Sequence, residues 1–260
     1  MIYDLQKASI LKRISAFLLD IILMLILVTG FAALISSILD ISSDIKVYDS
    51  IMSEYEEKFT NENEWNLVID FTNMDFEKLT EDQIKYIDSA AAQVYKDNRF
   101  LNICDLIFNK SLVLISLSLF FSFMILEFIV PLLFKNGQTV GKKIFSIAVM
   151  RIDGVKISPV FLFVRAILGK FTIETMIPAF ILLMHYFRLG TLVTLAVLLL
   201  IPLFEIILVI STKTNSLIHD VLSSTVVVDL QSQMIFESVE AKEEYRLRIH
   251  NDDVKNSKYF

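Results

Sequence analysis

The sequence predicts an all-α membrane protein: a four-helix transmembrane bundle with a helical extracytoplasmic insertion and a small cytoplasmic β-hairpin or strand element. Three observations support this fold class. Hydrophobic residues make up 55% of the 260 residues, a higher share than in most soluble domains. Four apolar stretches approach or exceed the roughly 20 residues that a helix needs to cross a bilayer. Basic residues gather in short segments, and a long acidic segment separates the first two apolar stretches.

The four predicted spans contain most of the long apolar runs. The first extends from Ile14 to Ile38 and the second from Ser111 to Phe134. The third extends from Val160 to Phe187 and is interrupted by charged residues, so its first half either crosses the bilayer or lies along the interface. The fourth extends from Thr191 to Ser211. The first run is too long for the apolar core of a cleaved signal peptide.

The basic residues predict the orientation. Lysine and arginine outnumber the acids in the N-terminal arm and in the connection between the second and third spans, and such segments tend to stay in the cytoplasm. We therefore expect a multi-pass protein of the cell membrane with both termini cytoplasmic. The expected parts are the arm and first span (1–38), the insertion (39–110), the other spans with the hairpin (111–230) and a cytoplasmic tail (231–260).

The insertion is too long for a simple connector. Thr80 and Gln83 have the spacing of a capping box, which predicts that a helix begins there and continues to Tyr95. The insertion is therefore expected to be helical, and the tail is expected to hold a short helix from Ser238 to Arg248.

Two β-branched runs flank Asp153-Gly154, a pair that favours the type I′ turn of a hairpin. We therefore expect residues 146–152 to pair with residues 155–158. A two-stranded hairpin is only marginally stable in water, so Thr225–Val228 is expected to add a third strand.

Each span also carries charge at a similar depth from its inner end. A charged residue at the centre of a membrane helix costs about 2.5–3.5 kcal/mol on insertion scales, so such residues are expected to turn inward and pair. We expect the acids of the first, second and fourth spans to pair with the basic residues of the third. The residues are Asp20 in the first span, Glu127 in the second, Arg165, Lys170 and Glu174 in the third, and Glu205 in the fourth.

This set contains four acids and two bases, so the interior would hold two uncompensated negative charges if all were ionised. Either some acids keep a proton, or a cation or water occupies the site. One hypothesis is transport through this charged layer, either of a proton or monovalent cation, with Asp20 as the leading carrier, or of a small solute. The alternative is a membrane scaffold or accessory subunit in which the charges fix helix packing and the surface binds protein partners or anionic lipid.

No catalytic signature is present. Residues 137–143 have too short a spacer for a phosphate-binding loop, and we find no zinc spacing or nucleophile elbow. We expect neither an enzyme nor a cofactor, metal ion or nucleic-acid partner. The expected partners are the lipid bilayer and, since four helices make a thin wall for a pathway, a second copy of the chain or another membrane protein.

Three passages together resemble the RDD family of bacterial membrane proteins, named for one arginine and two aspartates. The combination is specific, because the passages are far apart in the chain. They are Arg13 with Asp20; Gly137–Lys143 followed by Asp153-Gly154 and Arg165; and His219-Asp220 leading into the β-branched run that ends at Val228.

The resemblance implies a multi-pass membrane protein whose molecular function is mostly unassigned. Transport of ligands is suggested for the family, and cation/proton exchange is proposed for some members. In such a transporter Arg13 and Asp220 would brace the cytoplasmic mouth. Three features depart from the family pattern: Ser224 stands where a glycine is usual, the long insertion is an addition, and four spans are predicted where the core family pattern needs fewer.

Overall fold

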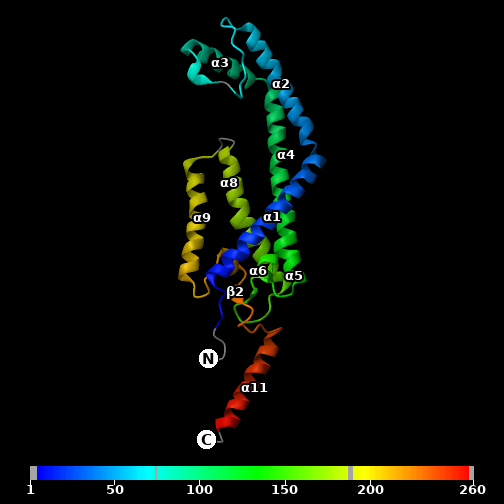
Figure 1. Cartoon of the computed structure of the whole chain (residues 1–260), viewed down its shortest axis with the longest axis vertical. Helices are drawn as coiled ribbons and strands as arrows, with labels where there is room; N and C mark the ends of the chain where they lie inside the picture. The colour runs from blue at the N-terminus through cyan, green and yellow to red at the C-terminus, as the bar shows by residue number, and fades with distance from the viewer. Residues whose placement is uncertain (1–4, 74, 187–189, 258–260) are drawn as a thin grey trace. The chain divides into compact units, whose positions relative to one another are not determined.

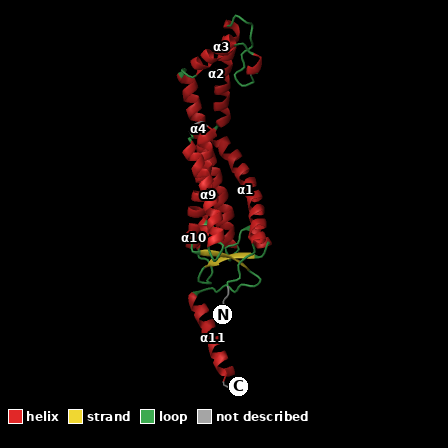
Figure 2. Ribbon diagram, turned by 90° about the vertical axis from the view of Figure 1, so that its left-hand side faces the viewer, coloured by secondary structure: helices red, strands yellow, loops and turns green. Residues whose placement is uncertain are grey.

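The computed structural model describes residues 5–73, 75–186 and 190–257, which are mainly helical with one small sheet (Figures 1 and 2). The chain forms two compact units, residues 30–118 and the remainder. Four helical stretches of the described residues are long and apolar enough to cross a membrane, and they confirm the predicted fold class: Ile10–Leu39, Asn98–Leu133, Pro159–Tyr186 and Leu192–Ser211.

The first two stretches begin before the predicted spans for identifiable reasons. Helix α1 (Ile10–Leu39) begins one residue after Ser9, whose hydroxyl accepts a hydrogen bond from the Lys12 amide at 3.3 Å. Helix α4 (Asn98–Phe123) begins before its apolar run because Phe100 and Ile103 are buried in the core of the insertion. Phe187, the predicted end of the third span, lies outside the described residues.

The unit formed by residues 30–118 has its own core. Helix α2 (Ile41–Glu62), the 3₁₀ turn η1 (Phe76–Lys78) and helix α3 (Glu81–Val94) lie between the ends of α1 and α4 in the sequence. The predicted capping box is confirmed, since the Thr80 hydroxyl accepts from the Gln83 amide and the Gln83 side chain accepts from the Thr80 amide. The buried core of this unit consists of Ile51, Phe59, Ile69, Ile87, Ala90, Val94, Phe100 and Ile103.

In the other unit, two of the apolar stretches contain π-helix. The stretch that begins with α4 continues through η2 (Met124–Ile129) into α5 (Val130–Leu133). The next consists of α7 (Pro159–Phe163), the long π-helix η3 (Val164–Met176) and α8 (Ile177–Tyr186), and α9 (Leu192–Ser211) follows. The π-helical segments hydrogen-bond from residue i to i+5, as in the bond from the Ile177 amide to the Thr172 carbonyl. Such segments are often found at functional sites.

The sheet pairs β1 (Ile147–Arg151) with β2 (Thr225–Asp229) in antiparallel register, next to α10 (Ile218–Leu222) (Figure 2). The predicted hairpin partner is therefore largely wrong, because residues 155–158 contribute only a bridge between Lys156 and Met150 to this sheet. The turn is not type I′ either, since Gly154 (φ +85°) but not Asp153 has positive φ. A three-residue loop results, in which the Arg151 amide donates to the Val155 carbonyl at 2.9 Å.

Two further helices complete this unit. The short helix α6 (Val140–Ile144) precedes β1, and α11 (Val239–Ser257) follows β2. Helix α11 continues well beyond the predicted end at Arg248. One face of the sheet packs on Ala16 of α1 and Leu162 of α7, which joins the sheet to the N-terminal parts of the two apolar stretches that contain them.

Candidate functional site: a buried charge cluster

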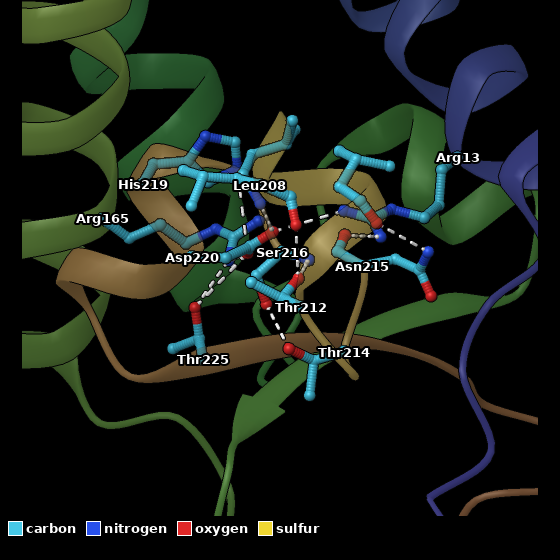
Figure 3. Close-up of polar contacts among 12 residues, drawn as sticks. Arg13, Arg165, Leu208, Thr212, Thr214, Asn215, Ser216, His219, Asp220 and Thr225 are labelled. Atoms are coloured by element: carbon cyan, nitrogen blue, oxygen red, sulfur yellow. Dashed lines mark hydrogen bonds and ion pairs between the residues drawn. The ribbon is translucent and has the colours of Figure 1, made fainter. Parts of the chain in front are cut away.

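The candidate site is a cluster of charged side chains that are largely buried. At its centre is Asp220, a fully buried residue of α10 that two arginines contact from opposite sides (Figure 3). Arg13 of α1 lies 3.2 Å from Asp220 Oδ2 through Nη2. Arg165 of η3 donates from Nη1 to Asp220 Oδ1 and, at 2.7 Å, to the Thr225 hydroxyl. An ion pair therefore joins Arg13 and Asp220, the two residues that were predicted to brace the cytoplasmic mouth.

The local sequence explains why Asp220 sits there. Its carboxylate accepts a hydrogen bond from the Leu217 amide at 3.2 Å, which caps the first turn of α10. Burial alone would raise the pKa of Asp220, but the charges of Arg165 and Arg13 outweigh burial and hold the pKa well below its usual value. Asp220 thus remains a carboxylate that joins α1, η3 and α10.

Asp20 has a different environment from the one that the sequence suggested. Its carboxylate accepts from the Thr139 hydroxyl and, at 2.8 Å, from the Gly141 amide, so it caps the N-terminus of α6. Carboxylates stabilise this end of a helix because free amide groups are exposed there. Gly141 permits the approach, since a Cβ at this position would collide with the Ala16 carbonyl oxygen. Asp20 therefore positions α6 on α1.

The predicted pairing between the second and third spans is confirmed for one pair. Lys170 Nζ of η3 lies 2.5 Å from Glu127 Oε1 of η2, and both side chains are largely buried. The pair joins the two π-helical segments to each other.

The remaining acids of the spans lie together. Glu174 of η3 accepts from the His219 amide at 2.9 Å, and its Oε1 lies 2.7 Å from His219 Nδ1. The Glu205 carboxyl of α9 faces the Glu174 carboxyl and the Ile218 amide. Among the described residues, Glu205 Oε1 is the one buried side-chain oxygen without a hydrogen-bond partner. An unsatisfied buried oxygen is costly, and this one lies next to a second carboxyl.

The six predicted residues therefore do not form a single layer of pairs. Asp20 and Glu205 were expected to pair with the basic residues of the third span, and neither does so. Lys170 and Glu174 of η3 also have different partners, since Lys170 contacts Glu127 of η2 while Glu174 contacts His219 of α10.

The structure also corrects the charge balance. Three ionisable residues that were not counted among the spans' interior charges are at least partly buried in the cluster: Arg13, Lys142 and Asp220. The cluster then holds five acids and four bases: Asp20, Glu127, Glu174, Glu205 and Asp220 against Arg13, Lys142, Arg165 and Lys170. His219 does not supply the missing positive charge, because burial, with a smaller contribution from Arg165, lowers its pKa below the usual value despite Asp220 and Glu174. The excess is one negative charge.

Sequence reasoning missed three of these features. Lys142 was not counted among the interior charges, yet it is 8% exposed. The capping of α6 had a usable signal, because Thr139 precedes the helix as an N-cap and the Lys142 amide lies 3.3 Å from its hydroxyl. The contact between His219 and Glu174 had no such signal, since it joins residues far apart in the sequence.

The sequence model of the RDD family matches residues 7–224, which include all the residues of the cluster. No curated protein and no solved structure was found to match the chain.

Proposed function

Because the chain belongs to the RDD family of membrane proteins, we propose that it is a transporter in which the Glu174–Glu205 pair binds one proton or one monovalent cation. The observation that carries the proposal is Glu205 Oε1, buried without a hydrogen-bond partner beside a second carboxyl. Adjacent carboxylates repel each other unless a proton or cation lies between them. One bound positive charge would also balance the excess of the cluster.

The proposal replaces Asp20 with Glu205 as the leading carrier. Asp20 accepts two hydrogen bonds from the end of α6, so its oxygens already have partners. Glu205 lies on α9, a helix without a fully buried residue, so local movement of α9 would open the pair at little cost in buried contacts. Arg165 and Lys170 are internal counter-charges bound to Asp220 and Glu127.

We propose that the four apolar stretches cross a bacterial cell membrane with both termini in the cytoplasm, where the basic arm and the basic connection lie. The binding site is then close to the cytoplasmic ends of the helices. The transporter is expected to work as a homo-oligomer, because four helices leave a thin wall around a pathway. Nothing in this proposal requires an enzymatic reaction.

The Glu205→Gln variant tests the proposal in proteoliposomes. An amide binds no proton at neutral pH and coordinates cations weakly, so ion-coupled flux should fall to the level of empty liposomes. Proton movement is followed with an internal pH-sensitive dye, in separate runs with sodium, with potassium and with neither.

Asp20→Asn is the matched control, since it also neutralises one buried acid of a span. It should lower the unfolding free energy by about 1.5–3 kcal/mol through weaker capping of α6, while the flux per folded molecule stays near the wild-type value. Unchanged flux in Glu205→Gln would contradict the transport proposal and favour the scaffold. Loss of flux in Asp20→Asn alone would return the carrier role to Asp20.

A further inference from the structure

Lys142 is a buried lysine that has no part in the binding site proposed at Glu174 and Glu205. It lies on α6 and is 8% exposed. Asp20 holds the first turn of α6 through the Thr139 hydroxyl and the Gly141 amide, and the charged groups nearest to Lys142 are Lys170, Glu127, Arg165 and Asp20. Its neighbour Lys143 is exposed and extends over the Phe134 ring, with Nζ 3.8 Å from the ring centroid.

The Lys142 amine has no hydrogen bond or ion pair with any described residue. The acids that face it already have partners, since Glu127 pairs with Lys170 and Asp20 caps α6. The basic groups that face it from η3 are Lys170 and Arg165. A buried ammonium without a counter-charge is costly, and a lysine in this position tends to lose its proton.

We propose that the Lys142 amine is a second proton-binding site, separate from the Glu174–Glu205 pair. Burial, the main cause, lowers the pKa of Lys142 to about 7, with repulsion from Lys170 and Arg165 acting in the same direction and Glu127 and Asp20 opposing it. When the amine is neutral, the excess negative charge of the cluster grows from one to two. Loss of this proton therefore favours uptake of a proton or cation elsewhere in the cluster.

The site is tested by its effect on folding, which does not depend on transport. The unfolded chain keeps the Lys142 proton up to the ordinary pKa of 10.5, whereas the folded chain releases it at about pH 7. The unfolded state thus binds more protons between these values, so stability rises with pH in this window. Below pH 7 both states are protonated and the contribution of Lys142 is flat.

Equilibrium unfolding of the full chain in mixed micelles, from pH 6 to pH 9, compares the wild type with Lys142→Met. Above pH 7 the ratio of their folding constants should increase in favour of the wild type by up to about tenfold per pH unit. Lys142→Gln is a second variant without the amine and should give the same slope. Lys143→Met is the matched control, and its ratio to the wild type should stay constant.

A constant ratio between the wild type and Lys142→Met would overturn the proposal, because the amine would then keep its charge in the folded chain. A ratio that depends on chloride concentration but not on pH would also overturn it, since an anion would then be neutralising the ammonium. A ratio that rises with pH, together with normal ion-coupled flux in Lys142→Met, would establish the proton site independently of the transport proposal.

Discussion

The Asp220→Asn variant is expected to lose about 3–5 kcal/mol of unfolding free energy, the largest loss among charge-neutralising changes in this chain. Arg13 and Arg165 both contact this carboxylate, and without it two guanidinium groups would face each other in a buried site. The connection among α1, η3 and α10 would weaken at the same time. Chemical unfolding in mixed micelles measures the loss.

Asp229→Asn is the matched control for this variant. Asp229 also pairs with a basic residue near the start of α1, since Lys12 Nζ lies 2.6 Å from its Oδ2, but this pair is partly exposed. Exposed ion pairs contribute about 0–1 kcal/mol, so the control should remain close to the wild type. Equal losses in the two variants would contradict the central role of Asp220.

The Asp220 contribution has a defined pH dependence. The pKa of this group is lowered in the folded chain, so its stabilisation is complete above the unfolded value of 3.8 and is lost as the pH falls through the lower folded value. The difference between the wild type and Asp220→Asn should therefore be constant at neutral pH and should shrink in acid.

The Gly169→Ala variant is expected to have the second large effect, although it adds only one methyl group. A Cβ at Gly169 of η3 would lie 2.5 Å from His219 Cβ and 2.7 Å from His219 Cα. Backbone cannot yield as a flexible side chain can, so α10 must move away from η3. Overpacking of this kind typically costs about 1–3 kcal/mol, and here it also separates His219 from Glu174.

Gly169→Ala should therefore lower both stability and ion-coupled flux. Gly30→Ala is the matched control, because a Cβ at Gly30 of α1 would meet nothing within 4 Å; in a helix it should be neutral or slightly stabilising. Flux assays in proteoliposomes and thermal unfolding of the same samples measure the two effects. Wild-type stability in Gly169→Ala would show that α10 does not need its close contact with η3.

The sequence was sufficient for the parts of the fold that depend on local patterns. Apolar length located the four stretches that are long enough to cross a membrane, and the spacing of Thr80 and Gln83 located the start of α3. The family passages brought Arg13 and Asp220 into one motif, and the structure shows them in contact. Ser224 keeps the turn that a glycine would favour, with φ +48°.

The same reasoning could not locate the contacts that depend on tertiary packing. Depth along each helix placed Asp20 and Glu205 near Arg165, but depth says nothing about rotation around the helix axis. Depth also gives no sign that α10 supplies His219 as the partner of Glu174. The strand partner was also misjudged, because Asp153-Gly154 suggested a local hairpin while β1 pairs with the more distant β2.

The central claim is that the Glu174–Glu205 pair holds one proton or monovalent cation. Infrared spectroscopy of the protein in nanodiscs tests it most directly, because the carbonyl stretch of a protonated carboxyl is separate from the bands of a carboxylate. We expect a protonated-carboxyl band in the wild type and in Asp20→Asn that is missing in Glu205→Gln, or a carboxylate band that shifts with sodium or potassium in the first two proteins only. Identical spectra for all three proteins, insensitive to pH and to both cations, would contradict the account.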